Sequence, residues 1–154
     1  MYKQIITILC FTLLFSTLSA KPMTLRSGKY ALCEIITTLN PQNNKTEKLT
    51  IIETIEIKML ENGNFIATPL DKTTKYFTNA VGYADRTGKV IFGFTLLKNK
   101  KLYSVNYSGN VTIDRYIRGK LIAIFPGAEA AIKGDWAMKE VDDKEDPKQI
   151  DFWK

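Results

Sequence analysis

The sequence contains no histidine, and this absence removes a whole class of chemistry. Serine–histidine and cysteine–histidine nucleophiles, imidazole metal sites and imidazole general bases all need that side chain. The chain has two cysteines, Cys10 and Cys33, which are too few for a thiolate metal cluster. An enzyme would have to use carboxylates, lysine or tyrosine, and no sequence feature places two acids across a cleft, as glycoside hydrolysis requires. We therefore expect a non-enzymatic binding protein without cofactor or metal.

The sequence also lacks an apolar run long enough to span a membrane as a helix. The run from Ile5 to Leu18 is shorter than the roughly 20 residues that such a helix needs. It follows Met1-Tyr2-Lys3 and precedes Ser19-Ala20, and a basic tip, an apolar core and small residues in this order are typical of a secretory signal. We expect residues 1–20 to be cleaved, the rest to be periplasmic or secreted, and no stable membrane span to remain.

Cleavage after Ala20 would leave one domain without a disulfide. The remaining 134 residues are enough to bury a sizeable core. Cys10 would leave with the signal, so that Cys33 would have no partner. Because Cys33 alternates with Ala31 and Ile35, we interpret it as a buried apolar residue.

The net charge of +6 is concentrated in the centre of the chain. Residues 72–120 carry ten basic and two acidic side chains. A positive region of this kind would steer acidic partners, an acidic protein among them. The alternative is that the lysines keep sheet edges soluble. Tyrosines among these charges could stack on single-stranded nucleic acid, but an exported protein is not expected to meet it.

Alternating apolar residues predict β-strands along most of the chain. Early strands are predicted at 30–38, 48–60 and 65–70, with Asn62-Gly63 as a two-residue hairpin turn. Residues 88–125 are predicted to form four short strands. Their predicted markers are Val90 to Leu96, Tyr103 to Tyr107, a reversal at Ser108-Gly109-Asn110, then Val111, Ile113 and Ile117, and lastly Leu121 to Phe125. A closing strand is expected to end at Val141.

Strands at this spacing, with short turns and no convincing long helix, predict an all-β domain over residues 21–141. We expect an antiparallel up-and-down barrel of about eight strands, because closure removes exposed edges, with a β-sandwich as the alternative. Residues 142–154 are charged and interrupted by Pro147, so we expect a mobile tail.

Two strand openings carry a resemblance to a known group. Gly28-Lys29-Tyr30 and Gly134-Asp135-Trp136 resemble the glycine-x-aromatic strand openings of the calycins, the lipocalin-like and avidin-like barrels. The chain departs from the lipocalin pattern in having Tyr30 where that pattern has tryptophan, and in lacking the usual disulfide. The resemblance implies a barrel that binds something small in its interior or at its mouth.

Two charges fall on apolar strand faces and suggest a site. Glu53 is in register with Ile51 and Ile55, and Arg115 is in register with Ile113 and Ile117. Buried ions need partners, so we hypothesise a polar anchor in which the two charges pair inside the barrel. Its candidate walls are Phe92, Tyr103 and Tyr107. The alternative, which the cost of burying charge favours, is a β-bulge that returns either side chain to solvent.

These patterns rank three functions. The first is an exported binding protein that holds a small or extended ligand in or at the mouth of the barrel. The second is a protein-partner module, such as an inhibitor or an adhesion or assembly factor, that docks through its loops or basic centre. The third is an outer-membrane barrel, which the short strands disfavour.

Overall fold

The computed structural model describes residues 24–40, 45–74, 77–98, 100–126 and 131–154. The predicted signal sequence, residues 1–20, lies outside these ranges. Helix within them is limited to two single turns, η1 (Glu61–Gly63) and η2 (Pro147–Gln149). Neither has the length or the hydropathy of a membrane-crossing helix, and no other described segment does.

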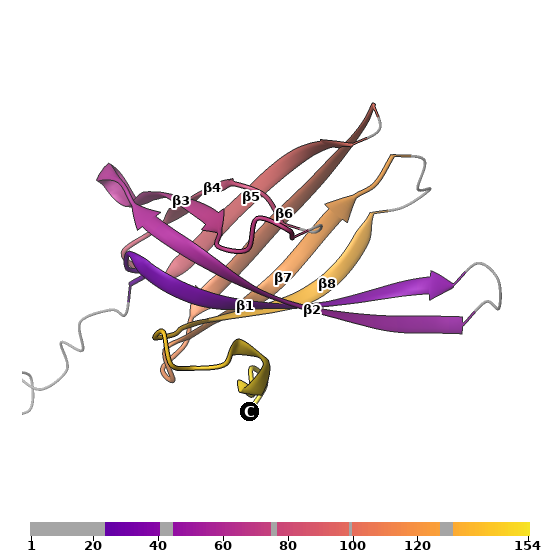
Figure 1. The fold of residues 1–154 in the computed structure, drawn as a ribbon. Helices are drawn as coiled ribbons and strands as arrows, with labels where there is room; N and C mark the ends of the chain where they lie inside the picture. The colour runs from indigo at the N-terminus through magenta and orange to yellow at the C-terminus, as the bar shows by residue number, and fades with distance from the viewer. Residues whose placement is uncertain (1–23, 41–44, 75–76, 99, 127–130) are drawn as a thin grey trace, which may run out of the picture.

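Eight antiparallel strands close into a barrel, which confirms the predicted fold class (Figure 1). The strands are β1 (Gly28–Asn40), β2 (Lys45–Met59), β3 (Asn64–Pro69), β4 (Ala80–Ala84), β5 (Lys89–Lys98), β6 (Lys101–Val111), β7 (Tyr116–Ile124) and β8 (Ile132–Glu140). Each pairs with the next in sequence, and β1 pairs with β8 to complete the ring. The order is therefore up-and-down, as the short turns predict.

The Asn62-Gly63 turn forms as predicted. Both residues have positive φ, 58° at Asn62 and 82° at Gly63, and they lie in η1 between β2 and β3. The amide of Leu60 donates to the carbonyl of Asn64 over 2.7 Å and closes the turn. These two residue types accept left-handed backbone at low cost, which explains why this local signal was reliable.

The central stretch has three strands where the sequence predicts four. Ser108-Gly109-Asn110 is not a reversal but lies within β6, where Gly109 pairs with Val90 and Gly119. The chain reverses instead at residues 112–115, where Ile113 is 97% exposed. Glycine is needed at position 109 for packing, because a Cβ there would lie 2.7 Å from the Trp136 ring.

Aromatic rings fill the middle of the barrel. Tyr107 stacks on Phe92 with centroids 4.3 Å apart, and Trp136 meets both rings edge-on at 5.8 and 5.2 Å. Phe65 and Phe77 extend the cluster, and all five side chains are buried. Each such ring stabilises the fold by roughly 1.5–3 kcal/mol through burial, and the edge-on geometry adds to this. The barrel interior at this level is therefore packed.

A second, smaller core lies outside the barrel, between the sheet and the C-terminal residues. Phe152 packs with Ala31, Cys33, Ala137 and Val141, and Cys33 is buried and unpaired. The backbone carbonyl of Phe152 accepts a hydrogen bond from Arg118 over 3.0 Å. The sequence predicts a mobile tail, whereas the structure packs its end against β1 and β8 (Figure 1). Around Ala31 and Cys33, β1 is therefore covered on its outer face as well as on its inner face.

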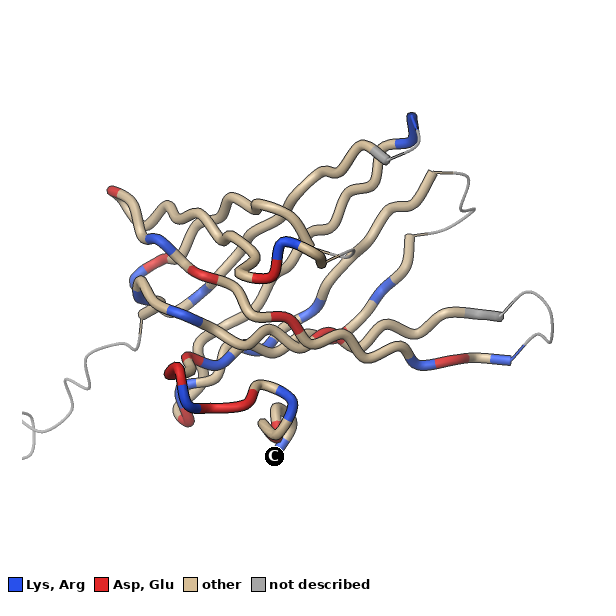
Figure 2. The backbone as a smooth tube through the Cα atoms, viewed as in Figure 1, with Lys and Arg blue, Asp and Glu red and all other residues tan. Residues whose placement is uncertain are grey.

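The basic residues of the centre lie in the turns, toward strand ends and, at Arg118 and Lys120, within β7 (Figure 2). Along β4, β5 and β6, the outward-facing positions carry one charge, Lys89, before the basic hairpin tip at Lys100 and Lys101. This sheet face is therefore nearly uncharged, although a quarter of the chain's residues are charged.

Candidate functional site

The structure brings together only some of the five predicted site residues. Phe92 and Tyr107 stack in the interior. Tyr103 lies near the start of β6 and contacts Phe125 edge-on, with centroids 5.5 Å apart. Glu53 projects inward from β2 and is partly buried, whereas Arg115 is exposed.

The predicted ion pair between Glu53 and Arg115 is wrong. Arg115 lies in the turn between β6 and β7 with φ at 65°, so the alternation that placed it inside ends before it. Glu53 accepts a hydrogen bond from Thr74 instead. The register of β1 and β2 is unbroken around Glu53, so no bulge returns this carboxyl to solvent. The exposed position of Arg115 therefore rules out the paired anchor, and the inward position of Glu53 rules out a bulge that returns Glu53 to solvent.

An interior carboxyl that the sequence analysis missed is Glu34 on β1. Its side chain is 4% exposed, and Tyr107 donates a hydrogen bond to Glu34 Oε1 over 2.6 Å across the barrel. The signal was present, because Glu34 alternates with Tyr30, Leu32 and Ile36, all of which are buried. The sequence prediction used instead the alternation of Ala31, Cys33 and Ile35, which lie on the opposite face of the same strand.

Both interior carboxyls have a raised pKa. Burial, with a smaller contribution from the charge of Glu53, raises the pKa of Glu34 to about 7, although the hydrogen bond from Tyr107 opposes the rise. Burial also raises the pKa of Glu53, which the Thr74 hydrogen bond opposes. The described side chains place no salt-bridging cation on either acid. With a pKa of about 7, Glu34 changes its protonation state near neutral pH.

This interior offers little room for a ligand. The rings of Phe92, Tyr107 and Trp136 occupy the space where a calycin-like site is expected. Tyr107 is already committed to Glu34. Within the described residues, no group of three or more metal-ligating side chains comes together either. The arrangement is suited to holding the barrel together.

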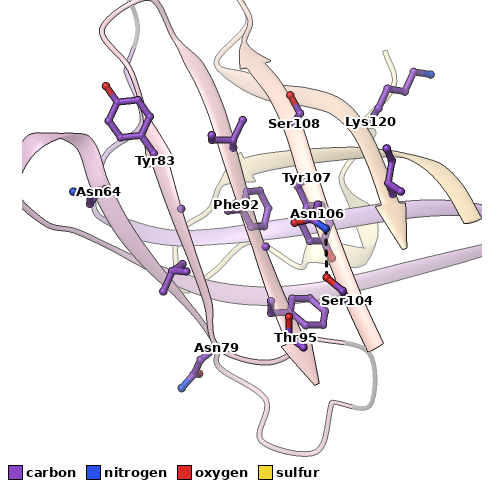
Figure 3. Close-up of a pocket in the computed structure, with 16 residues that line it drawn as sticks. Asn64, Asn79, Tyr83, Phe92, Thr95, Ser104, Asn106, Tyr107, Ser108 and Lys120 are labelled. Atoms are coloured by element: carbon purple, nitrogen blue, oxygen red, sulfur yellow. Dashed lines mark hydrogen bonds between the residues drawn. The ribbon is translucent and has the colours of Figure 1, made fainter. Parts of the chain in front are cut away.

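A groove of about 820 Å³ crosses the outer face of β4 to β7 (Figure 3). Its floor lies at Gly93, the one outward position of β5 without a side chain. A Cβ there would lie 2.7 Å from the Val105 carbonyl and 2.8 Å from the Asn106 side chain, so glycine keeps the floor low. Ile91 and Thr95 flank this point on the same strand.

Exposed apolar side chains form the walls of this outer groove. Val81 is 70% exposed, and Tyr83, Ile91 and Ile122 are each more than 40% exposed. Polar groups surround them, namely Asn64, Asn79, Ser104, Asn106, Ser108 and Lys120. Lys120 is paired with Asp135. An apolar patch with a polar rim is typical of a surface that binds a partner.

The sequence analysis did not identify this groove, because it followed the alternation of one face of β5 and β6 and did not consider the other. Val81 and Tyr83 alternate with inward Gly82, and Ile91 alternates with inward Phe92, so both faces of these strands are apolar. Continuous apolar character on exposed strands was the available signal.

No protein-family model, curated protein or solved structure matches the chain.

Proposed function

We propose that the protein is an exported, non-enzymatic partner-binding module that holds an uncharged, extended segment of another protein in the outer groove. This is the second of the three functions that the sequence suggests. The proposed binding surface differs, because it is a sheet face and not the loops or the basic centre. The observation that carries it is the exposed apolar wall formed by Val81, Ile91 and Ile122 around Gly93.

The contrast between the two sides of the same strands supports this choice. Inward residues such as Phe92 and Tyr107 are buried against other rings, so their apolar surface is already used. Outward residues such as Val81 and Ile122 have no such cover within the described chain. Burying them against a partner would contribute roughly 25 cal/mol for each Å² removed from water.

The chemistry of the groove limits the partner. The rim is mostly amides and hydroxyls, and the Lys120 charge is paired with Asp135. Charged partner segments would therefore lose solvation without a matching ion. A segment rich in small apolar and hydroxyl side chains fits better. In this proposal the calycin-like resemblance concerns the architecture of the barrel, and no ligand is inferred from it.

Native mass spectrometry of the protein purified from its own host tests the proposal. We expect the wild-type protein to retain a protein or peptide partner and the Val81→Lys, Ile122→Lys double variant to lose it. Both side chains are exposed, so lysine is tolerated by the fold while placing two charges in the groove.

Ile113→Lys is the matched control, because Ile113 is even more exposed and lies in a turn away from the groove. This variant should retain the partner. The proposal is overturned if the double variant keeps the partner as well as the control does, or if the retained species is a small molecule that survives both substitutions.

A further inference from the structure

The β1–β2 hairpin projects beyond the rest of the barrel and leaves one strand edge unpaired (Figure 1). β2 pairs with β1 from Lys45 to Ile57, but with β3 only from Ile55 to Met59. Over residues 48–53, the other edge of β2 therefore has no neighbouring strand in the described chain. An unpaired edge is a template for a further strand.

The direction of the backbone groups on this edge follows from the register. The carbonyl of Thr54 accepts from the amide of Leu70, which places the hydrogen-bonding groups of the even-numbered residues on the β3 side. The unbroken register carries this parity back along β2. Lys48, Thr50 and Ile52 thus direct their N–H and C=O groups to the open side, where no described residue bonds to them.

A cavity of about 490 Å³ lies beside this edge. Its lining includes Thr50 and Ile52, whose side chains face outward, and Ile51 and Glu53, whose side chains face inward. Because the cavity touches both faces of β2, it lies beside the edge of that strand, where an added strand would run. Pro69, the last residue of β3, also lines the cavity.

The charges around the cavity select the side chains of an occupant. Glu53, Asp71 and Asp146 line it against one basic residue, Lys148. Glu53 Oε2 is buried and has no hydrogen-bond partner in the described structure. A residue opposite Ile51 on an added strand would be diagonal to Glu53, within reach of a long side chain. A lysine or arginine there would supply the missing donor.

From these observations we propose that the open edge of β2 binds an extended peptide by strand addition, with a lysine or arginine of the peptide directed toward Glu53. Backbone hydrogen bonds to Lys48, Thr50 and Ile52 supply the affinity, and the cationic side chain supplies the specificity. This site is separate from the outer groove on β4 to β7 and does not depend on its function.

The experiment uses a pool of seven-residue peptides with β-branched residues at every position except a central lysine. Amide hydrogen exchange, followed by NMR on the full protein, reports on the edge directly. At about 1 mM peptide, a concentration that detects weak binding, we expect the Thr50 and Ile52 amides to exchange at least about tenfold more slowly. The same pool with alternate amides N-methylated removes the peptide's donors and should give no protection.

Two further arms test the role of the charge. A norleucine pool should bind the wild-type protein about tenfold more weakly than the lysine pool. This difference should disappear in Glu53→Gln, which keeps the shape and the Thr74 bond of Glu53. Asp71→Asn should reduce the difference in part. The Val81→Lys, Ile122→Lys variant should bind the lysine pool as wild type does, which separates this result from that of the groove.

The proposal is overturned if the Thr50 and Ile52 amides are unprotected by the lysine pool, or if the N-methylated pool protects them equally. The part assigned to Glu53 is overturned if the lysine and norleucine pools bind wild type with the same affinity.

Discussion

Replacing Glu34 with glutamine is expected to raise the free energy of unfolding above pH 7 and to leave it nearly unchanged near pH 4. Glu34 is buried in the barrel interior with one hydrogen bond, from Tyr107. Glutamine has the same shape, carries no charge, and keeps an oxygen that accepts the Tyr107 hydroxyl. The substitution therefore removes a charge that the interior disfavours at high pH and little else.

The size of the effect follows from the pKa of Glu34, which burial raises from 4.5 to about 7. A pKa raised in the folded state means that the folded protein holds its proton more tightly than the unfolded chain. Stability is then full below pH 4.5 and falls as the pH rises through 7. Each pKa unit corresponds to about 1.4 kcal/mol, so the wild-type protein should lose about 3 kcal/mol across this range on account of Glu34.

Urea denaturation at a series of pH values, followed by the fluorescence of buried Trp136 and by circular dichroism, measures this directly. The curves of wild type and Glu34→Gln should meet near pH 4 and separate by about 3 kcal/mol above pH 7. Glu53, whose pKa is also raised, is present in both proteins and adds a pH dependence to both curves. Glu56→Gln, at an exposed carboxyl of β2, is the control and should follow wild type. Parallel curves for wild type and Glu34→Gln would refute the reasoning.

Two other substitutions test the packing. Gly109→Ala should reduce the free energy of unfolding by about 1–3 kcal/mol, because its Cβ would lie 2.7 Å from the Trp136 ring and 2.5 Å from a backbone oxygen; urea denaturation measures it. Phe152→Ala should reduce stability by about 3 kcal/mol and speed the reaction of buried Cys33 with a thiol reagent, because Phe152 covers it. Ile113→Ala, in an exposed turn, should change neither quantity.

Gly28→Ala is the control for the glycine prediction. Its Cβ would lie 3.2 Å from the carboxyl end of Glu140, a flexible side chain that can move away, and at an ordinary contact distance of 3.8 Å from the Tyr30 ring. We expect a change within about 0.5 kcal/mol. Equal losses for Gly28→Ala and Gly109→Ala would contradict the account of Gly109 as a packing residue.

The fold could be predicted from the sequence because the signals were local. Asn62-Gly63 specifies a turn through the φ angles it accepts, and period-two alternation marks β5 through Phe92 and Phe94. The count of strands in the centre could not be predicted, since Gly109 and the turn glycines have the same local signature. What distinguishes Gly109 is the Trp136 ring, which arrives from β8, far along the chain.

The candidate sites were harder to predict for the same reason. The anchor hypothesis has Glu53 inside and the favoured alternative has it in solvent; the regular strand directs it inward, and its partner Thr74 comes from an irregular segment without a period. The outer groove depends on which faces remain uncovered after closure. The C-terminal Phe152 covers the outer face of β1, whereas nothing in the described chain covers Val81. No local pattern distinguishes these two faces.

The central claim is that binding occurs on the outer face of β4 to β7 and not inside the barrel. Photo-crosslinking in the host tests it most directly, with a photoreactive amino acid at Val81 in the groove or at exposed Lys58 on β2. The account predicts one discrete protein adduct from position 81 and none from position 58. No adduct at 81, together with a small molecule bound against Phe92 and Tyr107, would contradict it.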